Sequence, residues 1–155
     1  ELCESRPLVP GKEEYLDSEK YQVRHWDLDA PGSLRDLVAR VNRARRDHPA
    51  LQRNDGLVFF DTDNEQLLCY AKVTEDRSDA VLAVVSFDPK HTQAGWVTLD
   101  LEALGVRPDA PCEVHDLLTG RRYAWRGPRN YVELDPLALP AHVFHVVPSP
   151  AGGTA

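Results

Sequence analysis

A polar and aromatic segment near the start of the chain has a composition suited to contacts with sugars. Residues 11–27, GKEEYLDSEKYQVRHWD, contain five carboxylates, Lys20, two tyrosines and a tryptophan, with little periodicity of a helix or strand. Carboxylates and a lysine can bond to hydroxyl groups, and aromatic rings can stack on sugar faces. An exposed charged loop would have the same composition, so composition alone leaves both interpretations open.

Two histidines near the end of the chain have a spacing that could bind a metal ion. His142 and His145 form an HxxH pattern, and His115 precedes Asp116. Residues three apart on a strand point to opposite faces, so this pair could not share one ion without a bulge. We therefore expect no metal site.

An acidic cluster resembles the start of a calcium-binding EF-hand loop. Asp61, Asp63 and Glu65 occupy alternate positions. The sixth position of such a loop would be Gln66, where glycine is needed, and the twelfth would be Lys72, where glutamate is needed. The cluster therefore predicts a polar hairpin turn.

The aromatic residues of the second half could stack on sugar rings or fill a core. Tyr123 and Tyr131 lie in YAWRGPRNYV, where aromatic residues alternate as in a hairpin core. We expect core packing for these two tyrosines and for the three tryptophans. No GxSxG, phosphate loop or GxGxxG occurs, so the residues alone indicate no active site in this half.

The elements that must position these residues are one helix and a series of strands. Ser33 precedes an i, i+3, i+4, i+7 stripe that predicts an amphipathic helix of about three turns, stopped by Pro49. Eight short strands separated by turns then predict an antiparallel β-sandwich. We expect them at Leu57–Phe60, Gln66–Val73, Ala80–Phe87, Trp96–Leu101, Cys112–Leu117, Arg122–Trp125, Tyr131–Leu134 and His142–Val147.

Composition excludes several classes of function for this chain of 155 residues. A formal net charge of −7 argues against binding to nucleic acid, and no apolar run is long enough to span a membrane. Three cysteines without a CxxC pattern fit a reducing compartment, so we expect a cytoplasmic location. The chain contains no methionine, and its first thirty residues have no apolar periodicity. We expect it to be a piece of a longer protein.

Six sequence strings resemble one enzyme family. EEYLDSEKY at 13–21 and RHWD at 24–27 look like the segment after the last barrel strand of the α-maltose-1-phosphate maltosyltransferases, which belong to glycoside hydrolase family 13. VNRARRDHPAL at 41–51 is similar to the last barrel helix of that family. FDPKHTQAGWVTLDL, VHDLLTGRRYAW and NYVELDP resemble its C-terminal sandwich. The resemblance covers nearly the whole chain, and EEYLDSEKY is its most specific part.

The resemblance implies a mainly β fold. An antiparallel β-sandwich of the amylase C-terminal type would follow the last strand-loop-helix unit of a (β/α)8 barrel. Residues 1–50 would end the barrel, residues 51–148 would form the sandwich, and residues 149–155 would be a disordered tail.

The implied parent enzyme transfers maltosyl from α-maltose 1-phosphate to the non-reducing end of an α-1,4-glucan, with retention and release of phosphate. Its three catalytic carboxylates would lie upstream of Glu1, so we expect no catalytic residue here, no cofactor, and no activity of the fragment alone. The Lys and Tyr of the SEKY motif contact the maltosyl group in the family. They match Lys20 and Tyr21, which we expect to bind the donor. The partners implied are the rest of the barrel and a second copy of the full-length enzyme.

Two other interpretations stay open. The chain could come from another family 13 enzyme, such as a trehalose synthase or amylase, which would share the helix and sandwich but should lack EEYLDSEKY. It could also be a free-standing carbohydrate-binding module, which would show glucan affinity by itself.

Overall fold

The structure is a computed structural model that describes residues 6–16, 23 and 25–148. The chain divides into two compact units, Glu1–Arg40 and Val41–Ala155, and each is described here by itself. The expected domain limits of 1–50, 51–148 and 149–155 stay a prediction, and residues 149–155 lie outside the described part. Within the described residues no helix is long and apolar enough to cross a membrane.

The first unit contains a short paired loop. Pro7 and Tyr15 form an isolated antiparallel bridge, and the Leu16 N–H donates to the Arg6 carbonyl over 2.7 Å. Gly11 lies at the turn with φ of 81°, a value that favours glycine. The loop therefore brings residues 6–8 beside residues 14–16.

Helix α1 (Arg35–Asp47) confirms the amphipathic prediction. The Arg35 N–H donates to Ser33 Oγ over 3.2 Å, which satisfies one free amide at the helix start. Arg45 and Arg46 lie in the last turn, where positive charge suits the helix dipole. Pro49 begins a short 3₁₀ helix, η1 (Pro49–Gln52), which packs on strands β2 and β3.

All eight expected strands are present. Seven lie within two residues of their predicted limits, and the fourth begins three residues earlier than expected, at Gln93. The strands are β1 (Leu57–Thr62), β2 (Leu67–Val73), β3 (Ala80–Ser86), β4 (Gln93–Thr98), β5 (Pro111–Asp116), β6 (Arg122–Arg126), β7 (Arg129–Leu134) and β8 (Ala141–Pro148).

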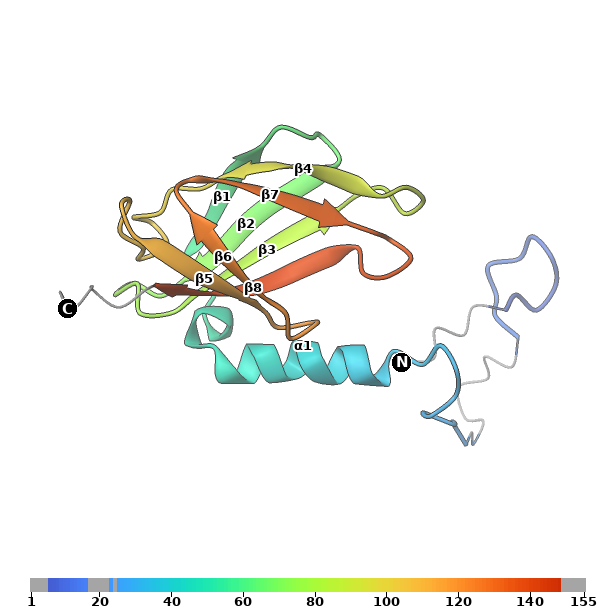
Figure 1. Cartoon of the computed structure of the whole chain (residues 1–155). Helices are drawn as coiled ribbons and strands as arrows, with labels where there is room; N and C mark the ends of the chain where they lie inside the picture. The colour runs from blue at the N-terminus through green and yellow to red at the C-terminus, as the bar shows by residue number, and fades with distance from the viewer. Residues whose placement is uncertain (1–5, 17–22, 24, 149–155) are drawn as a thin grey trace. The chain divides into compact units, whose positions relative to one another are not determined.

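The strands form one continuous antiparallel sheet in the order β6-β5-β8-β3-β2-β1-β4-β7. Strand β1 makes the corner, because Leu57–Phe60 pair with β2 whereas Asp61 and Thr62 pair with β4. The two edge strands, β6 and β7, are consecutive in the chain and joined at Gly127 and Pro128. The sheet therefore curls over itself (Figure 1), which confirms the mainly β, antiparallel fold class as a barrel-like sandwich.

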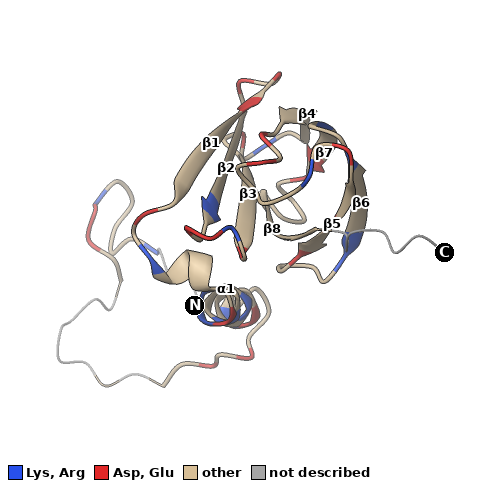
Figure 2. Cartoon of the chain, turned by 90° about the vertical axis from the view of Figure 1, so that its left-hand side faces the viewer, with Lys and Arg blue, Asp and Glu red and all other residues tan. Residues whose placement is uncertain are grey.

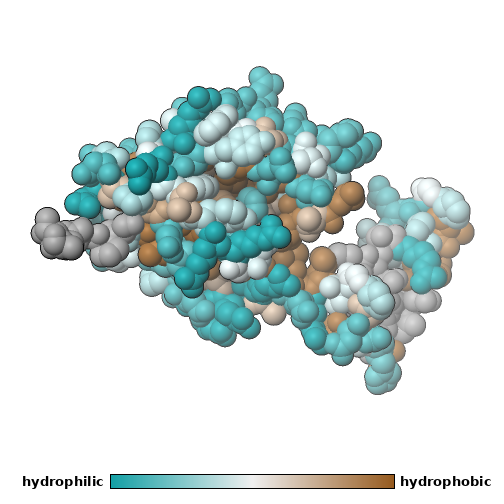
Figure 3. All heavy atoms as spheres, viewed as in Figure 1, coloured by the Kyte–Doolittle hydropathy of each residue, from teal (hydrophilic) through white to brown (hydrophobic). Residues whose placement is uncertain are grey.

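The core fills the inside of this curled sheet. Buried residues alternate along β2, β5 and β7, as expected for strands with one face inward. Leu82, Val114 and Phe144 are among the most deeply buried side chains. Charged residues gather at turns and outer positions of the sandwich (Figure 2), and hydrophilic residues predominate on the face shown in Figure 3.

Two cysteines belong to this core. Cys69 and Cys112 are both buried and free, and burial raises the pKa of Cys69 to about 12. Such thiols are inert in the folded state. Cys3 lies outside the described residues.

Candidate functional sites

The two residues that the resemblance assigns to donor binding, Lys20 and Tyr21, lie outside the described residues. Their role stays a prediction. Glu13 and Glu14, in the same sequence string, belong to the paired loop of the first unit.

An aromatic pair lies on the outer face of β4 and β7. Trp96 and Tyr131 are cross-strand neighbours, 41% and 51% exposed, with ring centroids 5.6 Å apart. The Arg129 guanidinium lies 5.0 Å from the centre of the Trp96 ring. We call Trp96, Tyr131 and Arg129 the aromatic ridge.

The ridge corrects the prediction that these two rings pack in the core. Along β7 it is Val132 and Leu134 that point inward, so Tyr131 shares the outer face with Glu133. In the sequence, Glu133 two residues after Tyr131 indicates that Tyr131 lies on the outer face of the strand. By contrast, Trp125 is buried and Tyr123 packs against the core, as expected.

Asp63, in the turn between β1 and β2, binds two members of the aromatic ridge. Its Oδ1 accepts the Trp96 backbone N–H at 2.7 Å, and its Oδ2 pairs with Arg129 at 3.2 Å. Asp63 and Glu65 of the acidic cluster therefore lie in a polar hairpin turn, as predicted, whereas Asp61 belongs to the end of β1. Exposed aromatic faces beside charged hydrogen-bonding groups are the chemistry that recognises sugar rings and their hydroxyls.

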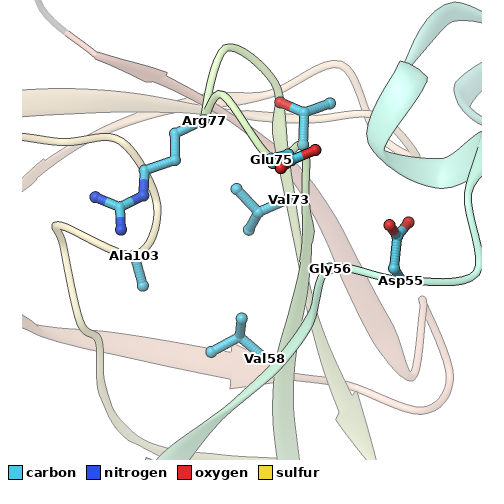
Figure 4. A pocket seen from close by; sticks show the side chains of 8 residues that line it. Asp55, Gly56, Val58, Val73, Glu75, Arg77 and Ala103 are labelled. Carbon is cyan, nitrogen blue, oxygen red and sulfur yellow. The ribbon is translucent and has the colours of Figure 1, made fainter.

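A pocket of about 330 Å³ lies beside the turn between β2 and β3. Val58 and Val73 form its apolar part, with Glu75 and Arg77 toward one end and Asp55 beyond Gly56 (Figure 4). Its remaining lining residues are Thr74 and Ala103. The lining contains no aromatic ring to stack on a sugar and no nucleophile with a neighbouring base.

Asp116 binds one of the two HxxH histidines. Its Oδ2 lies 2.9 Å from His142 Nδ1 and accepts the Thr119 hydroxyl at 2.6 Å, and its Oδ1 accepts the Leu118 N–H at 3.1 Å. Burial alone would raise the pKa of Asp116, but these hydrogen bonds outweigh burial and leave the pKa below its usual value.

His145, the other histidine of the pattern, lies beside a different carboxylate. Its Nε2 is 3.5 Å from Asp79 Oδ1, and the same oxygen lies 2.9 Å from His48 Nδ1. Asp79 Oδ2 accepts the Ala50 N–H at 2.9 Å. Burial and the nearby His48 and His115 lower the pKa of His145, against an opposing effect of Asp79.

The separation of the two histidines agrees with the strand argument that they cannot share one ion. The group of His48, Asp79 and His145 was not predicted from the sequence. Its members lie 31 and 66 positions apart, so no local spacing brings them together, and only the pairing of β3 with β8 and the packing of η1 do so.

The fold is shared with α-amylase chains. An α-amylase from Geobacillus thermoleovorans aligns over 82% of this chain and 26% of its own, with a TM-score of 0.60 and 16% identity. An Anoxybacillus α-amylase aligns over 83% of this chain and 25% of its own, with a TM-score of 0.57 and 17% identity. These likenesses define the fold class, an amylase-type β-domain.

The family model described as GLGE, C-terminal, matches residues 59–146, and the chain belongs to this family. The relatives bear out the resemblance. A protein of Myxococcus xanthus named alpha-1,4-glucan:maltose-1-phosphate maltosyltransferase is 51% identical over 136 residues, covering 88% of this chain and 20% of the relative. The protein of the same name from Methylacidiphilum infernorum is 44% identical over 146 residues, covering 94% and 22%. The chain thus spans about a fifth of the length of these relatives.

Proposed function

We propose that this chain is the C-terminal part of an enzyme that transfers maltosyl from α-maltose 1-phosphate to the non-reducing end of an α-1,4-glucan, releasing phosphate. The observation that carries the proposal is the 44–51% identity, over about nine tenths of the chain, to relatives that bear that enzyme's name. Of the alternatives, an amylase is disfavoured, because the two solved amylases share the fold at only 16–17% identity.

The chemistry itself would come from the rest of the enzyme. Retaining transfer needs a carboxylate nucleophile and a carboxylic acid/base held about 5 Å apart at the ends of barrel strands. The described strands belong to the sandwich, so this chain would not supply that pair. Purified alone, it should release no phosphate from α-maltose 1-phosphate above a blank without enzyme.

The contribution of this chain to the donor site would come from Lys20 and Tyr21. An ammonium group offers three donors, and a tyrosine offers a flat face and a hydroxyl, so the adjacent pair can replace water around the maltosyl hydroxyls. The carboxylates around them in EEYLDSEKY suit the same polyol.

The test is Lys20→Met in the full-length enzyme, because methionine keeps the apolar stem and removes the donors. Unpaired sugar hydroxyls cost about 1–3 kcal/mol, so kcat/KM for α-maltose 1-phosphate should fall by roughly 5- to 150-fold. Lys90→Met is the matched control. Lys90 is exposed in a sandwich turn, and the turn there uses its backbone N–H, which binds Asp88 Oδ1. A Lys20→Met enzyme within about twofold of the parent, with its fold intact, would refute the binding role.

A second candidate function is glucan binding by the sandwich itself, and the aromatic ridge favours it. The ridge holds two exposed rings and an arginine on one outer face. Stacking of a sugar on a flat π-face costs little side-chain entropy here, because the Trp96 ring already lies against Arg129, which Asp63 binds.

Glucan binding can be measured by affinity electrophoresis of this chain in gels containing soluble α-glucan. Tyr131→Ala should remove most of the retardation. Phe59→Ala is the control, since Phe59 is another exposed aromatic residue that contacts Tyr70 on β2 instead. No retardation of the unaltered chain would exclude both this role and the free-standing module.

We also propose a cellular location, the classes of partner that are absent and an oligomeric state. A cytoplasmic location fits the two free buried thiols, and the absence of nucleic acid and membrane partners fits the net charge of −7. A homodimer of the full-length enzyme would form through parts outside this chain.

A further inference from the structure

We propose that His48, Asp79 and His145 bind one divalent transition-metal ion, and that Zn²⁺ is the ion whose chemistry fits them best. His48 directly precedes η1, Asp79 directly precedes β3, and His145 lies on β8. One donor atom from each residue lies within 4.8 Å of the other two. The site therefore joins three segments that are distant in the sequence.

Two of the three distances between the donor atoms are close to those around a tetrahedral ion, and the third is within 4.8 Å. With metal–ligand bonds of about 2.0–2.1 Å, neighbouring ligand atoms lie about 3.3 Å apart. Asp79 Oδ1 is 2.9 Å from His48 Nδ1 and 3.5 Å from His145 Nε2. Binding requires the first distance to open by a few tenths of an ångström. His48 must also carry its proton on Nε2, which a neutral imidazole does readily.

The ligand set selects the class of ion. Two imidazole nitrogens and one carboxylate oxygen suit Zn²⁺ and its neighbours, whereas Ca²⁺ and Mg²⁺ prefer oxygen ligands alone. Three protein ligands leave a fourth position for water. The side chain of His145 is 30% exposed, which gives an ion a path from solvent.

The surroundings hold the carboxylate in place. Asp79 Oδ2 accepts the Ala50 N–H at 2.9 Å, so Oδ1 is the oxygen that faces both imidazoles. A hydrogen bond of this kind orients a metal-binding carboxylate. The side chains of His48 and Asp79 are 12% and 11% exposed, so little water competes for their donor atoms. A bound ion would fasten η1, and with it the end of α1, to the sheet.

The test is Zn²⁺ binding to this chain without an affinity tag, in a Cys3→Ser background so that no thiol outside the core competes. Competition with a chromophoric chelator gives stoichiometry and affinity. We expect one equivalent of Zn²⁺. Loss of a supporting group around a metal costs 10- to 100-fold in affinity, so loss of a ligand in His145→Ala should weaken binding by at least about 100-fold. His91→Ala is the control, because His91 binds Asp88 in an exposed turn, and the affinity of this variant for Zn²⁺ should stay within about twofold of the parent.

Circular dichroism shows whether the variants fold. Should His145→Ala unfold, His48→Gln and the visible absorption of Co²⁺ in the unaltered chain decide the same question, because four-coordinate Co²⁺ gives strong bands. Absence of stoichiometric Zn²⁺, or equal affinity of His145→Ala and His91→Ala, would overturn the proposal. The measurement involves no maltosyl transfer, so it stands or falls separately from the proposed function.

Discussion

Two aspartate–histidine pairs in the sandwich differ greatly in burial but hardly in geometry. Asp116 Oδ2 lies 2.9 Å from His142 Nδ1, and Asp88 Oδ2 lies 3.0 Å from His91 Nδ1. The side chains of His142 and Asp116 are 18% and 0% exposed, whereas those of His91 and Asp88 are 76% and 18% exposed. Two contacts of nearly the same length therefore contribute differently to stability. Water screens and replaces the exposed interaction of Asp88 with His91, but not the buried interaction of Asp116 with His142.

The pKa values of the two carboxyl groups do not reveal this difference. The backbone N–H of Lys90, followed by His91, lowers the pKa of Asp88 to about 2. The pKa of Asp116 is also lowered, although burial opposes the shift. The two sites differ in what happens to the hydrogen-bond partners when the carboxylate is removed. Water can bind the partners of Asp88 in place of the carboxylate, but it cannot do so at Asp116.

The largest effect in this comparison is expected from Asp116→Ala. The change leaves His142, the Thr119 hydroxyl and the Leu118 N–H without their acceptor in a buried place. Each buried group left without its acceptor costs about 1–3 kcal/mol, and three groups are left here, so we expect a loss of at least about 3 kcal/mol in the free energy of unfolding. Urea denaturation measures it. A loss below about 1 kcal/mol would show that water reaches the site and that the comparison is wrong.

Asp79→Ala should have an intermediate effect. Asp79 also binds a backbone amide and a histidine, but His145 beside it is more open to solvent. We expect a loss of about 1–3 kcal/mol in the free energy of unfolding, measured with a metal chelator present so that the ion-binding role does not contribute. If Asp79→Ala lost as much stability as Asp116→Ala, burial of the carboxylate itself, and not burial of its partners, would determine the loss in the free energy of unfolding.

The pH dependence of stability provides a second measure of how much Asp116 stabilises the fold. Its pKa is lower in the folded chain than in the unfolded one, where an aspartate has a value near 3.9. The ionised group therefore stabilises the fold fully above about pH 4, and this stability is lost as the pH falls through the lower folded value. Asp116→Asn should show a flatter decline between about pH 5 and pH 2 in denaturation measured at several pH values. A slope equal to that of the parent would assign the acid sensitivity to other carboxylates.

The sequence predicted the fold better than the polar sites. Period-two patterns such as that of β2 identify strands because apolar residues must alternate to reach one core. The strand argument also separated His142 from His145 correctly. It could not name their carboxylates, because Asp116 and Asp79 reach β8 through the pairing of β5 and β3 with that strand, which no local pattern encodes.

The aromatic ridge shows a different limit. In the sequence of β7, Arg129 and Glu133 alternate with Val132 and Leu134, and Tyr131 shares the phase of the two charged residues. Val132 and Leu134 are buried, whereas Tyr131 meets Trp96 on the outer face. The prediction rested on the spacing of the aromatic residues in YAWRGPRNYV and did not weigh the charged residues beside them, so it assigned the ring to the core incorrectly.

The smallest effect is expected from His91→Ala. The pair with Asp88 is intact in the folded chain, but His91 is exposed and water can take over its hydrogen bond. Gln93 Nε2 also donates to Asp88 Oδ2 at 2.8 Å, and the N–H groups of Lys90 and His91 still bind Oδ1, so the turn keeps most of its bonds without the imidazole. Exposed pairs of this kind contribute little, and we expect the melting temperature to change by no more than about 2 °C. Calorimetry of His91→Ala beside His142→Ala, the same substitution at the buried pair, provides the direct contrast. Equal shifts in melting temperature would mean that hydrogen-bond distance, and not the access of water, sets the strength of these pairs.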